Sequence, residues 1–415
     1  MDFIDSIYLE QYADLLLRFG VNLERGQSLL LELPQEHKEF AETIRKTARM
    51  MGAGEVIIFH NDIHAELAHL KKAIVESGGM TVPAEQAAVM QKCFAENGAS
   101  LSLMSPYPQT MATLSDKERK IWSQYQNDLR NIVREAIQKK RIHWCYACVP
   151  NAEWATQIYP ELSEKAALSQ MWMTMMNLCL IKRDNDPVEA WLSTYEKMAV
   201  QAQKLNSLPL RAVHLTTGLG TDVTIGVHKD CIWEGGLSRK DYSNGAFQPN
   251  IPSYEICTTT RRSIASGTIV ASYPLNVNGS IISGLSLSFK NGRVCHFNAR
   301  EGLGVLREII EHDEGSAYLG EIAFLETDLP IAQTGRLFYN TLLDENASCH
   351  IALGMGFPGN IKGIDPRNAT EAKACDVNVS AYHVDIMFGT NDVCADGICA
   401  DGQVVPIMQN GKFVL

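Results

Sequence analysis

The chain has 415 residues, of which 46% are hydrophobic and 20% are charged, so it is long enough for two or three globular domains. Its 48 acidic residues outnumber 37 basic ones, which gives a formal net charge of −11. Nucleic-acid phosphates attract clustered lysine and arginine, and the sequence contains no long basic run. We therefore expect no nucleic-acid partner.

The N-terminal segment lacks the features of an export signal. Asp2, Asp5 and Glu10 stand where a signal peptide carries positive charge and then an apolar run. No stretch reaches the roughly 18 consecutive apolar residues that a membrane span requires. The 11 cysteines, an odd number without an export signal, indicate free thiols in a reducing compartment. We expect a cytoplasmic protein without a membrane partner.

The first half alternates strands and helices. An amphipathic helix over 7–19 precedes an apolar run at 28–33, a helical segment at 36–51 and a second apolar run at 55–60. Strand, helix and strand within about 30 residues are typical of a parallel βαβ unit. Further helices are predicted over 116–139 and 187–205. Residues 1–205 are predicted to form an α/β domain.

Two motifs in this half invite a metal-site interpretation, and a structural interpretation is favoured for both. The first is Cys145-x-x-Cys148, which has no second ligand pair nearby and lies in an apolar run typical of a buried strand. The second is the group of Asp62 with neighbouring histidines. His64 and His69 are five residues apart and do not share a helix face, so the start of a solvated helix is favoured.

The second half changes character after residue 210. Short alternating runs are separated by Asn-Gly or Asp-Gly pairs, which favour tight hairpin turns, at 278–279, 291–292, 396–397, 401–402 and 410–411. One helix is expected over 301–312, with Leu303, Leu306 and Ile310 on its buried face. Gly218-Leu219-Gly220-Thr221 lacks the third glycine of a dinucleotide motif, so a hairpin turn is favoured there. The predicted fold is an α/β N-terminal domain followed by an α+β domain over 206–415 that is rich in antiparallel sheet.

Four segments of the second half contain candidate metal ligands. If 382–388 is a strand, His383 and Asp385 point to the same side. His350 lies among small and apolar residues, where a histidine is more often a hydrogen-bonded core residue. Glu255 and Glu321 each stand at the edge of an apolar run, where a buried charge needs a partner. Imidazole and carboxylate groups together suit Zn²⁺, Co²⁺ or Mn²⁺, but spacing alone does not assemble the four segments.

The segments NIPSYE (250–255), YLGE (318–321), FYNTLLDENASCHIALG (338–354) and SAYHVDIMFG (380–389) resemble those of the thermophilic-aminopeptidase family of metallopeptidases, typified by aminopeptidases T and S. The resemblance covers nearly the whole chain. It implies a metal-dependent aminopeptidase that releases N-terminal residues from short peptides. It also implies a homodimer.

The resemblance further implies a site with two divalent metal ions (Zn, Co or Mn). The implied ligands are Glu255, Glu321, His350, His383 and Asp385. Five ligands suffice for two ions if a carboxylate bridges them. The ions would activate a water, and either Glu321 or Glu255 would accept its proton. Two alternatives stay open: a catalytically silent metal-binding homologue, and a metallohydrolase that acts on another small amide.

The sequence departs from the family pattern around the predicted site. Phe357 stands where the family commonly has a tyrosine, and a phenyl ring neither binds metal nor donates a hydrogen bond. Tyr382 is a candidate substitute, although as a strand neighbour of His383 it should point the other way. Tyr254 replaces one acid of a frequent pair. Cys257 is expected to share the face of Glu255, where a structural thiol is favoured over a ligand.

Overall fold

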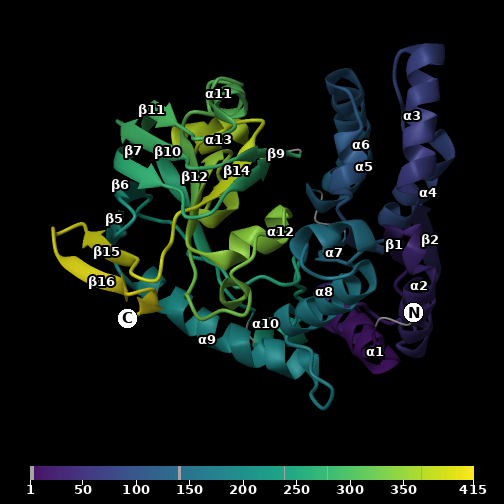
Figure 1. The fold of residues 1–415 in the computed structure, drawn as a ribbon. Helices are drawn as coiled ribbons and strands as arrows, with labels where there is room; N and C mark the ends of the chain where they lie inside the picture. Colours follow the sequence, from purple (N-terminus) through teal and green to yellow (C-terminus); the bar gives the residue numbers. More distant parts are fainter. Residues whose placement is uncertain (1–3, 139–141, 238, 278, 366) are drawn as a thin grey trace. The chain divides into compact units, whose positions relative to one another are not determined.

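The computed structural model describes residues 4–138, 142–237, 239–277, 279–365 and 367–415. The chain divides into two compact units (Figure 1). The first consists of Met1–Leu192 and Arg239–Pro252, and the second of Ser193–Ser238 and Ser253–Leu415. The division into domains 1–205 and 206–415 stays a prediction. Lys139, at the end of a predicted helix, and Asn278, in a predicted turn, lie outside the described residues.

The first unit is built on a four-stranded parallel sheet with the strand order β2-β1-β3-β4. The strands are β1 (Leu29–Pro34), β2 (Val56–Asn61), β3 (Ala99–Met104) and β4 (Trp144–Cys148). Every residue of β1 is buried, as its near-continuous apolar sequence requires in a parallel sheet covered on both faces. The predicted βαβ unit is confirmed, because α2 (Lys38–Met50) connects β1 to the parallel strand β2.

Helices make up most of the rest of this unit. They are α1 (Ser6–Leu15), α3 (Ile63–Ser77), α4 (Ala84–Ala95), α5 (Pro108–Ala112), α6 (Asp116–Gln138), α7 (Ala152–Ile158), α8 (Glu164–Leu178) and α10 (Arg239–Ser243); α9 (Pro187–Ser207) belongs in part to each unit. Asp62 caps α3 by accepting hydrogen bonds from the backbone of His64 and Ala65, which confirms the predicted helix start. Cys145 and Cys148 are buried in β4, as predicted.

In its described part, the second unit contains an 11-stranded sheet with the order β14-β13-β12-β7-β6-β5-β15-β16-β17, and β10 pairs with both β7 and β11. All of its pairings are antiparallel. The strands are β5 (Leu210–Thr216), β6 (Asp222–Val227), β7 (Ile256–Val270), β10 (Ser286–Lys290), β11 (Arg293–Asn298), β12 (Leu319–Phe324), β13 (His350–Gly354), β14 (His383–Met387), β15 (Cys394–Cys399), β16 (Val404–Gln409) and β17 (Lys412–Phe413). A separate hairpin joins β8 (Leu275–Val277) to β9 (Ser280–Ile282), and the helices are α11 (Leu303–Ile310), α12 (Thr341–Asp344) and α13 (Ala369–Ala374). The predicted fold class, an α/β part followed by a part rich in antiparallel sheet, is therefore found.

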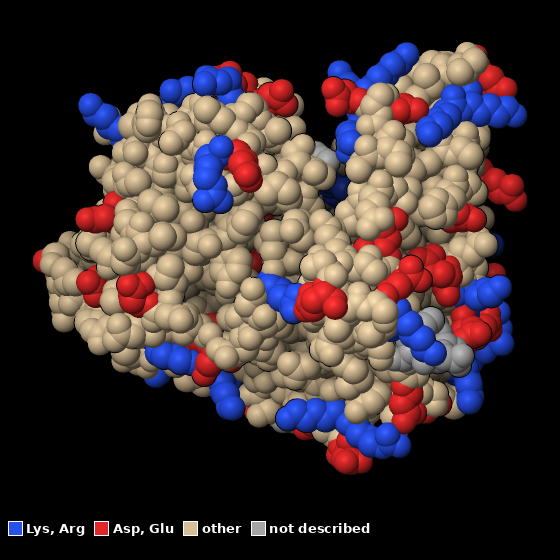
Figure 2. Space-filling model, viewed as in Figure 1, with Lys and Arg blue, Asp and Glu red and all other residues tan. Residues whose placement is uncertain are grey.

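Charged groups do not dominate the viewed surface of the second unit. Figure 2 shows acidic and basic side chains interspersed there, with uncharged residues covering most of the face. Across the described residues, no helix combines the length and the hydrophobicity that crossing a bilayer would need.

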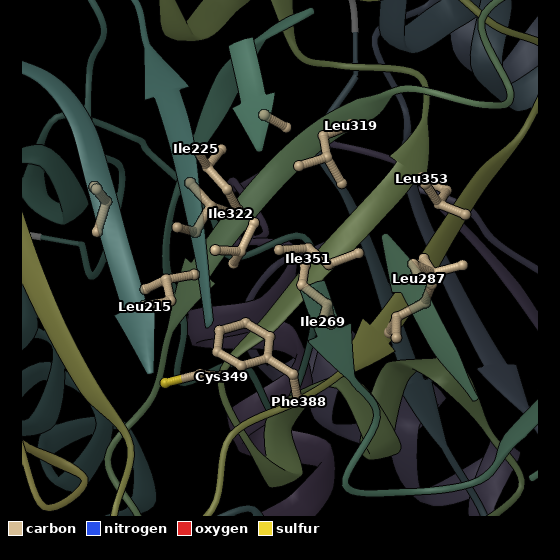
Figure 3. Packing of buried hydrophobic residues seen from close by; sticks show 14 of the residues in the cluster. Leu215, Ile225, Ile269, Leu287, Leu319, Ile322, Cys349, Ile351, Leu353 and Phe388 are labelled. Carbon is tan, nitrogen blue, oxygen red and sulfur yellow. The ribbon is translucent and has the colours of Figure 1, made fainter. Parts of the chain in front are cut away.

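The interior of the second unit is an apolar cluster contributed by most of its strands. Leu215, Ile225, Ile322, Ile351 and Phe388 are all at most 1% exposed and pack together (Figure 3). Burying a side chain of this size contributes about 1.5–3 kcal/mol, so this cluster stabilises the sheet that positions the candidate site described below.

The turns are partly as predicted. Asn291-Gly292 and Asn410-Gly411 have positive φ at both residues and join neighbouring antiparallel strands. The segment at 218–221 joins β5 to β6 as a hairpin. The prediction was wrong for Asp396-Gly397, which lies inside β15 beside a register shift. A β-bulge accommodates such a pair within a strand.

The helix predicted over 301–312 is found as the shorter α11. Leu306 and Ile310 are buried as predicted, but Leu303 is 37% exposed and Ile309 is buried in its place. Leu303 is the first helical residue, so it lies at the end of the helix rather than over its buried centre.

Candidate metal centre

The candidate site lies on four adjacent strands of the second unit, β14, β13, β12 and β7. Strand pairing places Asp385, Ala352, Glu321 and Thr259 directly opposite one another in a row across these strands. Residues directly opposite one another in antiparallel strands share a face of the sheet. The carboxylates of β12 and β14 therefore project from the same face, with only the Ala352 methyl group between them.

The two histidines project from that same face. His383 and His350 each lie two residues before a member of the row, on β14 and β13 respectively, and strand side chains alternate with a period of two. The same-side prediction for His383 and Asp385 is therefore confirmed. Glu255 immediately precedes β7 and reaches the group from the strand end.

The opposite face of these strands fixes their orientation. Ile322, Ile351 and Ile386 are at most 1% exposed and belong to the apolar core. On the site face, the neighbours of the candidate ligands are the small, fully buried residues Ala323 and Ala352. Large side chains on one face and methyl groups on the other leave room for the ligand side chains between neighbouring strands.

The five predicted residues are brought together in space. His350 Nε2 lies 3.3 Å from Glu255 Oε2, and His383 Nε2 lies 3.1 Å from both Glu321 Oε2 and Asp385 Oδ1. Two sets of three side chains each have ligand atoms within 4.8 Å of one another. The first set is Glu255, Glu321 and His350, and the second is Glu321, His383 and Asp385. Glu321 is the member that the two sets share.

The histidine orientations suit metal binding. His350 Nδ1 is 3.3 Å from the Ser348 carbonyl oxygen, and His383 Nδ1 is 2.8 Å from the Met355 carbonyl oxygen. A carbonyl oxygen only accepts, so Nδ1 carries the proton in both neutral rings. Each Nε2 points at the carboxylates, so without its proton it would turn a lone pair towards an ion held there, which is the arrangement commonly found around metal-ligating histidines.

The carboxylates of the site outnumber the imidazoles beside them. Among the residues that the structure describes, the recorded ion pairs of Glu255, Glu321 and Asp385 involve only His350 and His383. Burial and the neighbouring Glu255 raise the pKa of Glu321. Although burial opposes it, the hydrogen bond to Glu255 and the nearby carboxylates raise the pKa of His350 to about 10. Three carboxylates facing two imidazoles are a donor set that fits divalent cations.

Sequence reasoning assigned no role to Glu345. This residue begins a short 3-10 turn, Glu345–Ala347, and its pKa is raised by burial and by the nearby Glu255 and Asp385. It therefore adds another acid to the site without belonging to either set. Its neighbour Asp344 instead accepts hydrogen bonds from the backbone of Phe338 and Asn340 and holds the preceding loop. The sequence signal that could have indicated Glu345 was its place in an acid pair just before the apolar run that contains His350.

The structure also places the residues that depart from the family pattern. The ring centroid of Phe357 lies 5.0 Å from that of His383, so an apolar ring covers this imidazole. Tyr382 does not substitute for the missing hydroxyl, because its ring packs edge-on against His312 at 4.3 Å. Cys257 is paired with Ala323 and so shares the site face, as expected. Burial and the neighbouring Glu255 and Glu321 raise the pKa of its thiol, which favours the protonated form.

Comparison with known proteins agrees with this geometry. Residues 6–413 match the family described as thermophilic metalloprotease (M29). The chain is 32% identical over 406 residues to aminopeptidase AmpS of Bacillus subtilis and 30% identical over 408 residues to aminopeptidase T of Thermus aquaticus, with 98% of each chain covered in both cases. The solved structure of wild-type AmpT from Thermus thermophilus matches with a TM-score of 0.90 at 28% identity, covering 99% of this chain and 100% of that chain. The resemblance predicted from the sequence is confirmed, and the chain belongs to the thermophilic metalloprotease (M29) family.

Proposed function

We propose that this chain is a metal-dependent aminopeptidase that releases N-terminal residues from short peptides at a site with two divalent ions. The observation that carries the proposal is the pair of three-residue sets that share Glu321. A carboxylate has two oxygens, so one glutamate can contribute to two ions at once. The relatives named aminopeptidase support the same reaction.

In this proposal Glu255, Glu321 and His350 would hold one ion, and Glu321, His383 and Asp385 would hold the other. Histidine and carboxylate ligands suit Zn²⁺, Co²⁺ or Mn²⁺. Bound divalent ions would supply polarisation of the scissile carbonyl and would acidify water. The protein groups then orient the peptide and move protons.

Glu345 is our choice for the group that accepts a proton and returns it to the leaving amine. It interacts electrostatically with Glu255 and Asp385 yet belongs to neither set. Bound cations would lower its raised pKa, and its carboxylate would then be free to accept a proton from the activated water. The sequence-based candidates were Glu321 and Glu255, and both act as ligands in this proposal. Measuring metal content and turnover together separates the assignments. Glu345→Gln should retain both ions and lose turnover, whereas retained turnover in this variant would return the role to the sequence-based candidates, Glu321 and Glu255.

The first test uses metal-stripped protein titrated separately with Co²⁺, Zn²⁺ and Mn²⁺. The substrates are leucine p-nitroanilide with a free amino group and the same compound with an acetylated amino group. Metal-dependent cleavage of the free-amine substrate alone supports the aminopeptidase. Cleavage of both substrates would instead indicate a metallohydrolase that acts on other small amides.

A catalytically silent metal-binding homologue is the second candidate, and Phe357 is the observation that favours it. Its ring covers His383 but offers no hydroxyl to a developing negative charge. Tight metal binding without cleavage of a broad panel of free-amine peptides would support this candidate.

The assembly and the location of the enzyme are part of the same proposal. We place it in the cytoplasm as a homodimer that admits short peptides. Sedimentation that shows a monomer at micromolar concentration would contradict the dimer.

A further inference from the structure

The first unit contains a cavity of about 430 Å³ that the metal centre does not use. Its walls include the segments that follow the carboxyl ends of all four parallel strands. Glu36 and His37 follow β1, Asp62 follows β2, Tyr107 follows β3, and Glu153 lies beyond β4. Every lining residue belongs to the first unit.

This position is one where open parallel sheets bind ligands. In the order β2-β1-β3-β4, the chain goes from β1 to a neighbour on one side and then returns to β3 on the other side. The crevice outside the carboxyl ends at such a reversal is the general ligand site of open α/β sheets. The volume also lies in the range of about 300–1,000 Å³ that is typical of small-molecule sites.

The walls combine aromatic and acidic groups. Trp172 and Leu168, from the same helix, are the large apolar side chains of one wall, and both are almost fully buried. Glu36, Asp62 and Glu153 supply three carboxylates. Across the described residues, none of these three forms a recorded ion pair with lysine or arginine. On the face drawn in Figure 2, acidic side chains gather over the region where Figure 1 places β1, β2 and α7.

A buried histidine adds a neutral polar group to the wall. His37 is 5% exposed, and burial lowers its pKa to about 4 although Glu36 and the Pro150 carbonyl oppose the shift, so the ring is uncharged at neutral pH. Neither ring nitrogen makes a hydrogen bond of normal geometry. The ring packs edge-on against Trp172 at 5.7 Å. The carboxylates of the cavity wall therefore receive no positive charge from His37.

An anion is a poor match for this cavity, although helix N-termini lie around it. The Asp62 side chain already accepts from the first backbone N–H groups of α3, and Asn151 accepts from Trp154 of α7. Glu153 accepts from both the backbone and the hydroxyl of Thr110. The donors that would bind a phosphate or a carboxylate are thus occupied by the protein's own acceptors.

A single metal ion is also a poor match. Within the described ranges, the only sets of three potential ligand side chains with mutually close donor atoms are the two at the metal centre. The described acids of the cavity form no such set. A larger cation with an apolar part fits carboxylates beside an indole ring better than a chelated ion does.

We propose that this cavity binds a primary ammonium group carried on an apolar residue, such as the amino terminus of a short peptide with a hydrophobic first residue. Glu36 and Asp62 hold the ammonium group through the carboxylate oxygens that do not already accept from Tyr107 or from the start of α3, and Leu168 and Trp172 line the apolar part. Such a compound belongs to the proposed substrate class, so the cavity would be an accessory peptide-binding site. Its existence does not depend on the metal centre.

The test measures binding of 3-methylbutylamine, which has the ammonium group and the branched chain but no bond to hydrolyse, to the metal-loaded enzyme by calorimetry. The variant Glu36→Gln/Asp62→Asn removes two charges while asparagine keeps the helix cap. We expect at least fivefold weaker binding than in the wild type. The control Glu85→Gln/Glu96→Gln makes the same charge change at exposed positions outside the cavity and should bind like the wild type.

A second variant covers the case in which the double variant fails to fold. Ala152→Leu fills the cavity without changing any charge and should also weaken binding at least fivefold. His383→Ala should leave amine binding unchanged, and loss of binding in this variant would place the amine at the metal centre. Three results would each overturn the proposal. The wild type does not bind the amine, or both cavity variants bind it as tightly as the wild type does, or the wild type binds 3-methylbutanoate as tightly as the amine.

Discussion

Replacing Glu321 with glutamine tests the centre of the candidate site. Its side chain is 5% exposed, it lies 3.1 Å from His383 Nε2, and it belongs to both ligand sets. Glutamine has nearly the same shape but carries no charge, so both ions would lose an anionic ligand. We expect kcat/KM to fall at least about 1,000-fold, which corresponds to about 4 kcal/mol of lost transition-state stabilisation.

The same substitution should stabilise the metal-free protein. Glu321 is buried near Glu255 and Asp385, and its raised pKa shows that the folded protein disfavours its charged form. Removing one of several like charges from a buried site should therefore raise the free energy of unfolding at neutral pH. That gain raises the melting temperature.

Added metal should make the wild type more stable than Glu321→Gln. A ligand that binds only the folded state stabilises it by mass action, and the wild type binds metal more tightly than the variant. Scanning calorimetry with EDTA and then with Co²⁺, combined with steady-state kinetics, measures both effects. Glu326→Gln, just beyond the same strand and paired with Lys412, is the matched control. The reasoning is refuted if Glu321→Gln keeps more than a tenth of the activity, or if its metal-free form melts below that of the wild type.

Three further substitutions test separate parts of the structure. Ala352→Leu puts a large side chain between Glu321 and Asp385 and should reduce metal content, measured by atomic absorption, to below a tenth of the wild-type value. Phe357→Tyr adds a hydroxyl to the ring that packs against His383 and should raise kcat up to about tenfold; an unchanged kcat would contradict a role for that hydroxyl. Burial and the nearby Asp62 raise the pKa of Glu66 to about 7, so the folded state holds this proton more tightly and stability falls as pH rises from about 4.5 to 7. After allowing for the partial exposure of Glu66, we expect the free energy of unfolding of Glu66→Gln to be about 1 kcal/mol higher than that of the wild type at pH 8 and equal to it at pH 4. Urea titration measures both values.

Local periodicity predicted those parts of the fold that depend on neighbouring residues. The apolar runs at 28–33 and 55–60 predicted two parallel strands, and alternation predicted that His383 and Asp385 share a face. Local chemistry also fixed the start of α3 at Asp62, which is a strong helix cap. The failure at Asp396-Gly397 shows the limit of such signals. A pair that favours a turn can lie inside a strand when pairing with strands on both sides holds it there.

The assembly of the site could not be predicted from spacing. Glu321 faces Ala352, and Ala352 faces Asp385, because three strands far apart in sequence pair in one register. A shift of one residue in any pairing would turn the ligand to the apolar face. The register depends on the packing of Ile322 and Ile351 in the core, which is a property of the whole sheet. The resemblance to a family supplied this long-range information, and local patterns did not.

The pair Asp344-Glu345 shows why even an adjacent acid could not be assigned from sequence. Either carboxylate could have entered the site, since both stand just before the strand that bears His350. Asp344 turns away and accepts hydrogen bonds from the backbone of Phe338 and Asn340, although burial raises its pKa to about 7. Those bonds hold the turn in which Glu345 begins the next helical segment and lies among the candidate ligands. Asp344 thus satisfies backbone donors of the loop, and Glu345 is left to interact with the candidate ligands. The loop conformation, rather than the residue type, decides which acid takes which role.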